Sequence, residues 1–432
     1  CEYPWIWVKT LISSTGFPLD IGVDIHAREL SMNESKPNDR GDQPSTESRK
    51  ALMGDTVLLI GGYGLAGRSI AELLLRYSAA SILLSGRNRD KGRRTAAELN
   101  SRHGGDRVSY VHCDASDGAS LLPALKRCDA VVTSLPMGAG ASSIVAEAAL
   151  AVGVHYMDLD VDPDKRSVMQ RIDPDVTRKN LLFLCDSGAF PGLPGFLANF
   201  AYRLSADLSE VRIGSVMEDD QLPFESARTF INPEAQRPII FDDEWRTVSL
   251  ANGRRFDFGG AFGSVKCYPF FLDELEEIPT KKGRLAKLGA YTGTRNKMAA
   301  LIMVLWPLLG LSRSDKNLDR GGRLLSWTVS RFSRRPFSLV FVMQAVNWDS
   351  RTTSVRIEFA DAYTGTAIPA VAALFQQLDP ARTACGVKFM GHAVEPQRYL
   401  EDLRLLGADI EIKKSWNAGT RVSRGRSTRR RI

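Results

Sequence analysis

The sequence has little cysteine and histidine, and neither recurs at a redox or metal-binding spacing. The five histidines form no HxxxH or HExxH pair. The six cysteines are spread along the chain, at positions 1, 113, 128, 185, 267 and 385. A CxxC redox motif, a disulfide framework and a zinc site are therefore not expected. This cysteine usage is typical of a reduced compartment, so we expect a cytoplasmic protein.

Several catalytic signatures are also missing. The chain contains no GxSxG nucleophile elbow and no GxxxxGK[ST] phosphate loop. No tyrosine is followed four residues later by the lysine that short-chain reductases use for proton delivery; Asp160, for example, follows Tyr156. These absences disfavour the enzyme classes that depend on those motifs.

Positive charge is concentrated at the carboxyl end. The chain has 57 basic and 50 acidic residues, a formal net charge of +7. Eight basic and no acidic residues lie in 412–432, which leaves 49 basic against 50 acidic residues elsewhere. A near-neutral body lacks the basic surface of a nucleic-acid-binding protein, so no specific nucleic-acid partner is expected. We predict that 412–432 is a flexible basic tail.

Short apolar runs alternate with helical patterns up to residue 185. We expect strands at 56–60, 81–84, 108–112, 130–133, 154–158 and 181–185, with helices at 65–77, 90–101, 121–126, 142–151 and 163–177. Strict alternation predicts an α/β fold, a Rossmann-type doubly wound parallel sheet. Residues 1–52 include a polar stretch that cannot bury a core, so we predict a disordered extension there.

The regular alternation of strands and helices ends after residue 186. A loop rich in glycine and proline occupies 187–195, and strands are expected at 211–217, 264–270, 337–346 and 354–359. This pattern predicts an α+β second domain over 189–362, for substrate binding or oligomerisation. Helical patterns return at 367–378 and 394–406.

A glycine loop follows the first expected strand and opens the first helix. It reads Gly62, Tyr63, Gly64, Leu65, Ala66, Gly67. In this context GxGxxG indicates a dinucleotide site: Gly62 would permit the tight turn, Gly64 the approach of a pyrophosphate, and Gly67 close packing of helix on strand. The helix N–H groups would bind the phosphates. The alternative is a structural turn without a ligand.

The end of the second strand distinguishes NADP from NAD. An NAD site places Asp or Glu there for the ribose 2′-OH, whereas this chain has Arg87 and Asn88 and no carboxylate before Asp90. The guanidinium of Arg87 suits a 2′-phosphate, so we favour NADP over NAD. The alternative is that Arg87 is a solvated charge at a helix start.

Two further strand ends face the expected ligand crevice. Asp114 and Ala115 follow the third strand, near the place of the adenine edge, although Asp114 is nearly as well explained as a helix cap. Ser134, Leu135 and Pro136 follow the fourth strand, on the path toward the nicotinamide.

Four motifs together resemble the saccharopine dehydrogenase-like family, in its NADP-dependent reductase branch. They are VLLIGGYGLAGR at 57–68, LLSGRNRDK at 83–91, LCDSGAFPGLPGF at 184–196, and the carboxyl-terminal segments 364–378 and 386–410. The resemblance implies a dinucleotide domain made of 53–188 plus 363–411, with the second domain inserted. It also implies hydride transfer from NADPH, in the best-known members to an imine.

The resemblance is incomplete at the crossover between the domains. Phe190 and Gly195 stand where saccharopine reductases have an aspartate and a histidine. A zwitterionic substrate is therefore doubtful, and an apolar carbonyl or enoyl substrate is an alternative to the imine. A protein that binds NADP(H) without catalysis, in association with lipid, is the second hypothesis.

Few residues qualify as catalytic groups. Asp158 and Asp186, at the ends of the fifth and sixth strands, are the candidates, with Asp160 beside them; their alternative roles are caps and loop hydrogen bonds. Arg228 would bind a substrate carboxylate or remain a surface charge.

An uncharged segment, 298–312, is too short to span a bilayer, which needs ~20 apolar residues. It predicts a buried helix or one in an interface, such as a homodimer. The alternative is a peripheral lipid contact aided by the flanking Arg295, Lys297, Arg313 and Lys316.

Overall fold

The computed structural model describes residues 54–135, 140–160, 165–232, 237–249, 252–279 and 285–416. The extension predicted at 1–52 and residues 417–432 of the predicted tail lie outside these ranges.

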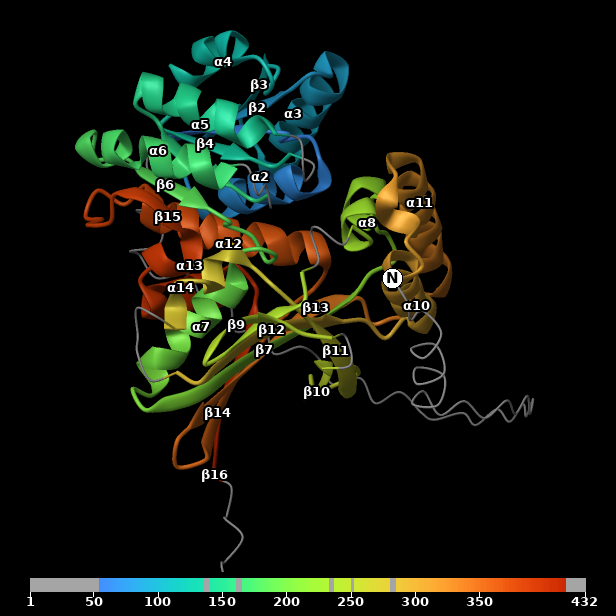
Figure 1. Ribbon diagram of the computed structural model, residues 1–432. Coiled ribbons are helices and arrows are strands. Elements are labelled where there is room, and N and C mark those ends of the chain that lie inside the picture. Colours follow the sequence, from blue (N-terminus) through green and yellow to red (C-terminus); the bar gives the residue numbers. More distant parts are fainter. Residues whose placement is uncertain are drawn as a thin grey trace, which may run out of the picture. The chain divides into compact units, whose positions relative to one another are not determined.

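The first sheet is parallel and has seven strands in the order β15-β6-β5-β4-β1-β2-β3 (Figure 1). All six predicted strands are present, and a seventh, β15, pairs in parallel with β6. This confirms the predicted Rossmann-type α/β class. The strand bounds are β1 Thr56–Ile60, β2 Ser81–Gly86, β3 Val108–His112, β4 Ala130–Thr133, β5 His155–Asp158, β6 Leu182–Cys185 and β15 Gly386–Phe389.

Helices cover both faces of this sheet, which explains its nearly continuous apolar strands. Along β1, Val57 and Leu59 pack into one core, whereas Leu58 and Ile60 pack into the other. The first core includes residues of α2 Leu65–Tyr77, α3 Arg89–His103 and α12 Ala362–Gln377. The second includes residues of α4 Gly118–Leu125, α5 Ala141–Val152 and α6 Lys165–Arg178.

The second sheet is mixed and has nine strands. Its main path is β10-β11-β12-β7-β13-β14-β16, and β8 and β9 extend from β12. Only the pairing of β12 with β7 is parallel on that path. The bounds are β7 Leu208–Glu218, β8 Ile239–Asp242, β9 Glu244–Thr247, β10 Arg254–Asp257, β11 Ser264–Phe270, β12 Lys287–Gly293, β13 Ser338–Asn347, β14 Arg351–Phe359 and β16 Asp409–Trp416.

The carboxyl end contributes to both sheets. Strand β15 completes the first sheet, followed by α13 Met390–Ala393 and α14 Pro396–Leu405, but β16 pairs with β14 in the second sheet. The prediction that 363–411 belongs wholly to the dinucleotide domain is therefore wrong at its end. The predicted start of the tail, at 412, is also wrong, because Ile410 and Ile412 pair with Ile357 and Val355 in the ladder.

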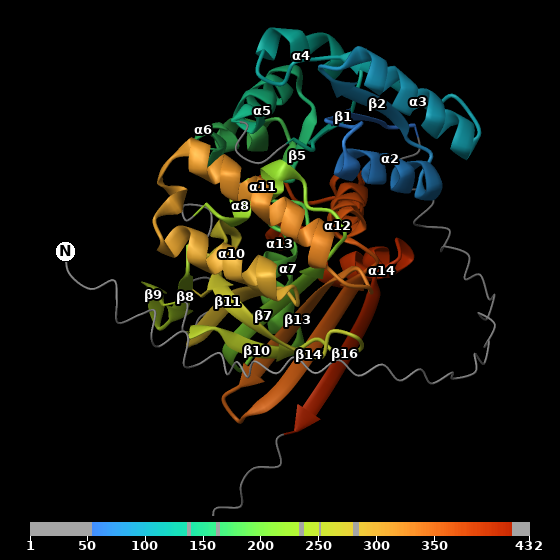
Figure 2. The same cartoon turned by 90° about the vertical axis from the view of Figure 1, so that its right-hand side faces the viewer.

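Three helices pack beside the second sheet: α8 Phe224–Phe230, α10 Lys297–Leu308 and α11 Asp315–Phe332 (Figure 2). Ala227, Ala299 and Leu325 bring one residue from each into a small core. Within the described ranges, no helix is both long enough and apolar enough to cross a membrane.

Helix α7 Leu193–Leu204 links the two sheets and begins against a buried carboxyl. The Gly192 N–H donates to Glu274 Oε1 at 3.0 Å, where Glu274 lies in the short 3-10 helix η2 Asp273–Leu275. A Cβ at Gly195 would lie 2.4 Å from Glu274 Oε2, so the absence of a side chain at Gly195 makes room for this carboxyl. Burial raises the pKa of Glu274 to about 8.

Glu274→Gln should therefore remove a pH dependence of stability. A carboxyl with a raised pKa keeps a proton that the unfolded chain releases, so the wild type should lose stability as the pH rises from 4.5 to about 8. Between pH 5 and 8 the variant should gain about 1 kcal/mol per pH unit over the wild type in urea unfolding. The exposed Glu244→Gln is the control. Equal slopes for all three proteins would contradict this assignment.

Candidate functional site

The glycine loop between β1 and α2 is sterically constrained at three positions. Gly61 has φ +79°, and a Cβ there would lie 2.3 Å from the Ser134 carbonyl oxygen. A Cβ at Gly62 would meet Leu84 at 2.7 Å, and one at Gly67 would meet the Gly61 oxygen at 2.6 Å. Gly61 and Gly62 both belong to the tight turn, in which the Gly64 N–H donates to the Gly61 carbonyl oxygen at 2.8 Å, and Gly67 permits close packing of the helix.

The amino end of α2 is open to an anion. Gly64 is its N-cap and supplies no side-chain hydrogen bond, and the first turn contains no acidic residue. Leu65 is 52% exposed, so this end of the helix faces outward. Unpaired helix N–H groups with a partial positive charge suit a diphosphate, so these residues fit that part of a dinucleotide.

Tyr63 ties the glycine loop to the end of β2. Its hydroxyl accepts a hydrogen bond from the Asn88 N–H at 3.0 Å, and its ring fills the space where a Cβ of Gly86 would stand. The Asn88 side chain caps α3 by accepting from the Lys91 N–H at 2.9 Å. Tyr63 and Asn88 therefore fix the turn that carries Arg87. The Arg87 side chain is exposed and forms no ion pair with any residue in the described ranges, which fits a 2′-phosphate.

The residues at the other predicted strand ends either lie beside the glycine loop or form hydrogen bonds with their near neighbours in the chain. Asp114 accepts hydrogen bonds from the hydroxyl and N–H of Ser116, at 2.7 and 3.0 Å, which lower its pKa. The cap of α4 is Asp117, so Asp114 and Ala115 stay at the end of β3 in a turn of their own. Ser134 and Leu135 adjoin Gly61, whereas Pro136 lies outside the described residues.

The predicted acidic residues are brought together by a lysine. Lys165, the first residue of α6, donates from Nζ to Asp158 Oδ1 and to Asp186 Oδ1, each at 2.7 Å, and also to the Asp160 carbonyl oxygen. The Asp186 N–H donates to Asp158 Oδ1 at 2.9 Å, and Ser142 donates its hydroxyl to the Asp160 carboxyl at 2.8 Å. We call Lys165, Asp158, Asp160 and Asp186 the lysine–aspartate cluster.

The carboxyls of the lysine–aspartate cluster have raised pKa values because they are buried together. Burial raises the pKa of Asp160 to about 7 and that of Asp186 to about 6. Desolvation lowers the pKa of Lys165, but Asp158 and Asp186 together outweigh it and raise that pKa well above the usual value. The lysine therefore stays charged, and the titrating proton belongs to the carboxyls.

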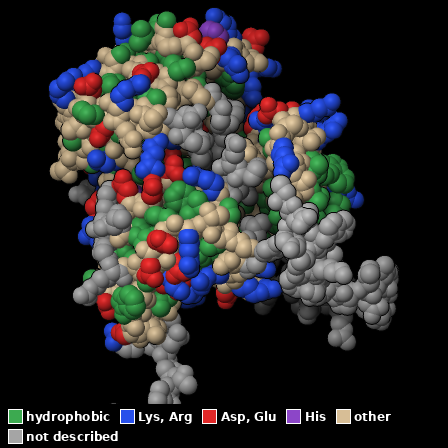
Figure 3. Space-filling model, in the orientation of Figure 1, with side chains coloured by type: hydrophobic (Ala, Val, Ile, Leu, Met, Phe, Trp, Pro, Cys, Tyr) green, Lys and Arg blue, Asp and Glu red, His purple; other side chains and the backbone are tan. Residues whose placement is uncertain are grey.

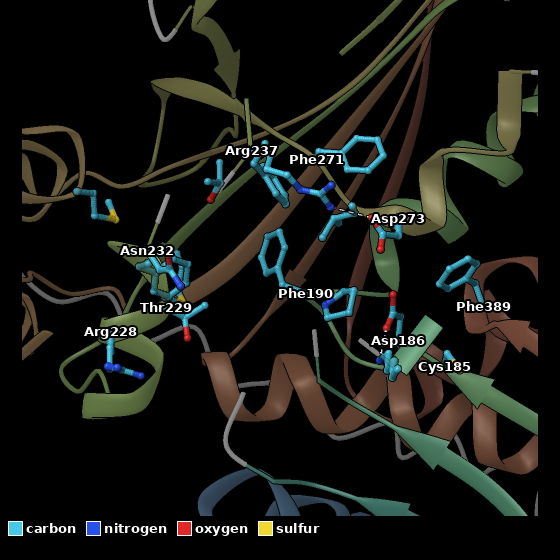
Figure 4. Close-up of a pocket in the computed structure, with 18 of the residues that line it drawn as sticks. Cys185, Asp186, Phe190, Arg228, Thr229, Asn232, Arg237, Phe271, Asp273 and Phe389 are labelled. Atoms are coloured by element: carbon cyan, nitrogen blue, oxygen red, sulfur yellow. Dashed lines mark hydrogen bonds and ion pairs between the residues drawn. The ribbon is translucent and has the colours of Figure 1, made fainter. Parts of the chain in front are cut away.

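A cavity of about 610 Å³ opens over this cluster (Figure 4). One wall contains Lys165, Asp186 and Phe190, from the carboxyl edge of the first sheet and the crossover loop. The second domain supplies most of the remaining lining, in which apolar side chains such as Met217, Leu222 and Met303 are mixed with polar ones such as Asp219, Thr229 and Asn232. The pocket therefore combines buried charged groups with apolar side chains, which suits a ligand that has an apolar part.

Arginines at the rim are already paired. Arg228 forms ion pairs with Asp315 and, at 3.0 Å, with Asp319. Arg237 pairs with Asp273 at 2.9 Å and lies over the Phe271 ring (Figure 4). The prediction that Arg228 binds a substrate carboxylate is therefore not supported, because its charge is neutralised within the fold.

The geometry first defines a class. A parallel sheet with a constrained glycine loop and an open helix amino end is a dinucleotide-binding domain. Residues 57–177 match the family model described as the saccharopine dehydrogenase NADP binding domain. This part of the chain is thus similar to the NADP-binding domain of saccharopine dehydrogenases, as the motifs predict, and the match supports NADP as the cofactor.

Two individual proteins are similar to this chain. Saccharopine dehydrogenase (L-Glu forming) from Saccharomyces cerevisiae has 14% sequence identity, and the match, with a TM-score of 0.57, covers 84% of this chain and 100% of that one. It confirms the two-domain fold. A highly reducing polyketide synthase of Aspergillus terreus is 33% identical over 86 residues, which span 20% of this chain and only 3% of that protein.

Arg87→Ala should weaken NADPH binding about tenfold or more and leave NADH binding unchanged, because hydrogen bonds to charged groups contribute about 1.5–3 kcal/mol. Titration followed by nicotinamide fluorescence measures both constants. Arg178→Ala, at the exposed end of α6, is the control. Unchanged NADPH affinity in Arg87→Ala would place the 2′-phosphate elsewhere.

Proposed function

We propose that this protein is an NADPH-dependent oxidoreductase that reduces an imine, carbonyl or enoyl group of an apolar substrate bound in the 610 Å³ pocket. The observation that carries the proposal is the lysine–aspartate cluster, two of whose members line that pocket. The cluster stands at the carboxyl ends of β5 and β6, the edge at which parallel sheets of this type bind ligands.

The protein residues would supply the proton and the positioning. NADPH, when bound, would supply a hydride to the substrate carbon, and the atom bonded to that carbon would gain electron density and need a proton. A protonated Asp186 can donate a hydrogen bond to that atom, the positive charge of Lys165 stabilises the electron density that develops there, and the cluster can replace the proton. The net change is NADPH, a proton and a C=X bond converted to NADP⁺ and H–C–X–H.

The pocket favours a substrate larger and less polar than an amino-acid conjugate. Phe190 lines the pocket, as Figure 4 shows, at the place where the resemblance puts an aspartate. Its ring is 4.7 Å from that of Phe341 and 5.7 Å from that of Phe270. These aromatic rings replace a polar contact by an apolar one. The five described cysteines are free thiols, which fits the cytoplasmic location that we also propose.

Asp186→Asn and Lys165→Met should each lower substrate-dependent NADPH oxidation at least about 100-fold, because proton donation and charge stabilisation act in the transition state. NADPH affinity should be unchanged. Asp186→Asn keeps the shape and one acceptor, so it tests the role even where Lys165→Met folds poorly. Arg171→Ala, exposed on α6, is the control. Full activity of Asp186→Asn would contradict the proposal.

The rate of reduction should fall as the pH rises through about 7, because the lysine–aspartate cluster loses its proton there. Asp160→Asn should move this limb of the kcat profile to lower pH, because it removes the carboxyl with the higher pKa and leaves Asp186, with a pKa of about 6, to titrate. A rate independent of pH between 5.5 and 8.5 would mean that the proton comes from elsewhere.

A further inference from the structure

Exposed apolar side chains gather on one pair of helices. Of the ten large hydrophobic residues that are exposed in the described ranges, seven lie between 298 and 332. They are Met298, Leu301, Leu308, Leu309, Leu324, Trp327 and Phe332, with exposures of 39–67%. We call them the α10–α11 face. Figure 3 shows hydrophobic side chains together over these helices.

The exposed apolar side chains of α10 lie along one side of the helix, because their spacing follows the helical repeat. Met298, Leu301 and Leu308 lie at intervals of three and seven residues, with Leu305 between them on the same side. On α11, Leu324 and Trp327 lie one turn apart, and the Trp327 ring meets that of Phe332 edge to face at 5.7 Å. Contiguous apolar surface of this kind marks an interaction site.

The charge around this face is strongly positive. Residues 297–335 contain eight basic side chains, at 297, 313, 316, 320, 323, 331, 334 and 335, and two acidic ones, Asp315 and Asp319. Both aspartates are paired with Arg228. A second copy of the chain meeting this face about a two-fold axis would bring two such positive surfaces together, which disfavours a dimer here. An anionic surface complements it.

Helix geometry matches a bilayer surface better than its interior. Helix α10 has twelve residues and contains Pro307, and the exposed aromatic rings of α11 are of the kind found at membrane–water interfaces. Arg295, expected as a flanking lipid contact, instead donates to the carbonyl oxygens of Ala261 and Arg334, at 2.9 and 2.8 Å, and belongs to the fold.

The same two helices form a wall of the pocket. Ala299 and Met303 of α10, and Leu325 and Val329 of α11, line the cavity. The helix pair thus has an exposed apolar side and a side that faces the pocket. A ligand dissolved in a lipid layer against the exposed side would be separated from the pocket by the thickness of one helix layer.

We propose that the α10–α11 face docks on anionic phospholipid bilayers and that the substrate is a lipid-soluble molecule taken from them. The second part rests on the proposed reductase function, whereas the first does not. Apolar side chains insert between the headgroups while the surrounding Lys and Arg side chains contact the phosphates.

Vesicle flotation of the full chain tests the docking. We expect binding to vesicles of phosphatidylcholine with 30% phosphatidylserine, weaker binding to pure phosphatidylcholine, and loss at high salt. Trp327→Glu should lower the bound fraction about tenfold or more. Trp348→Glu is the matched control, because both tryptophans are 57% exposed but Trp348 lies in the turn between β13 and β14.

Three flotation results would overturn the docking. The wild type would not float, both variants would float as well as the wild type, or both variants would lose flotation to the same extent. Light scattering tests a fourth contradicting result, in which the wild type is a dimer that binds no lipid and Trp327→Glu is a monomer.

A pair of aldehydes tests the delivery. Trp327→Glu should slow NADPH oxidation with vesicle-borne hexadecanal but not with soluble hexanal. Slowing with both, or with neither, would overturn delivery from the bilayer. No oxidation of either aldehyde by the wild type would count against carbonyl reduction, and flotation would still decide the docking.

Discussion

One buried ammonium group holds the functional edge of the first sheet together. Lys165 binds carboxylates at the ends of β5 and β6, and Asp186 adopts a left-handed backbone, with φ +58°, where the chain leaves for the second domain. A buried charge that loses its partner costs about 3–5 kcal/mol, so the geometry of this corner depends on all three side chains. The crossover loop and α7 start from this fixed point.

The parallel sheet was predictable because its signals are local. Each strand is a short run of apolar residues, and buried parallel strands have such runs in uninterrupted form. The glycine loop is predictable for the same reason, but the positive φ of Gly61 is visible only in the structure. Asp158 and Asp186 were found because strand ends meet at one edge.

The other half of the site has no local signal. From sequence alone, a lysine at the start of a helix is expected to be solvent-exposed. Only the three-dimensional structure shows that Lys165 is buried. Glu274 lies 82 residues from the glycine N–H that it accepts from, so no pattern near either residue reveals the contact. The pocket wall joins α8, α10 and α11, whose small shared core forms only through tertiary contacts. Spacing along the chain does not encode such distances.

The order in which the strands of the two sheets follow one another along the chain affects folding during synthesis. Strand β15 joins the first sheet and β16 the second, and both lie beyond residue 385. During synthesis, neither sheet can acquire its last strand until this final segment has left the ribosome. Until then, β6 and β14 present unpaired edges, the kind of surface that other chains add to. The two domains are thus coupled in folding by their topology, whatever the strength of the contacts between them.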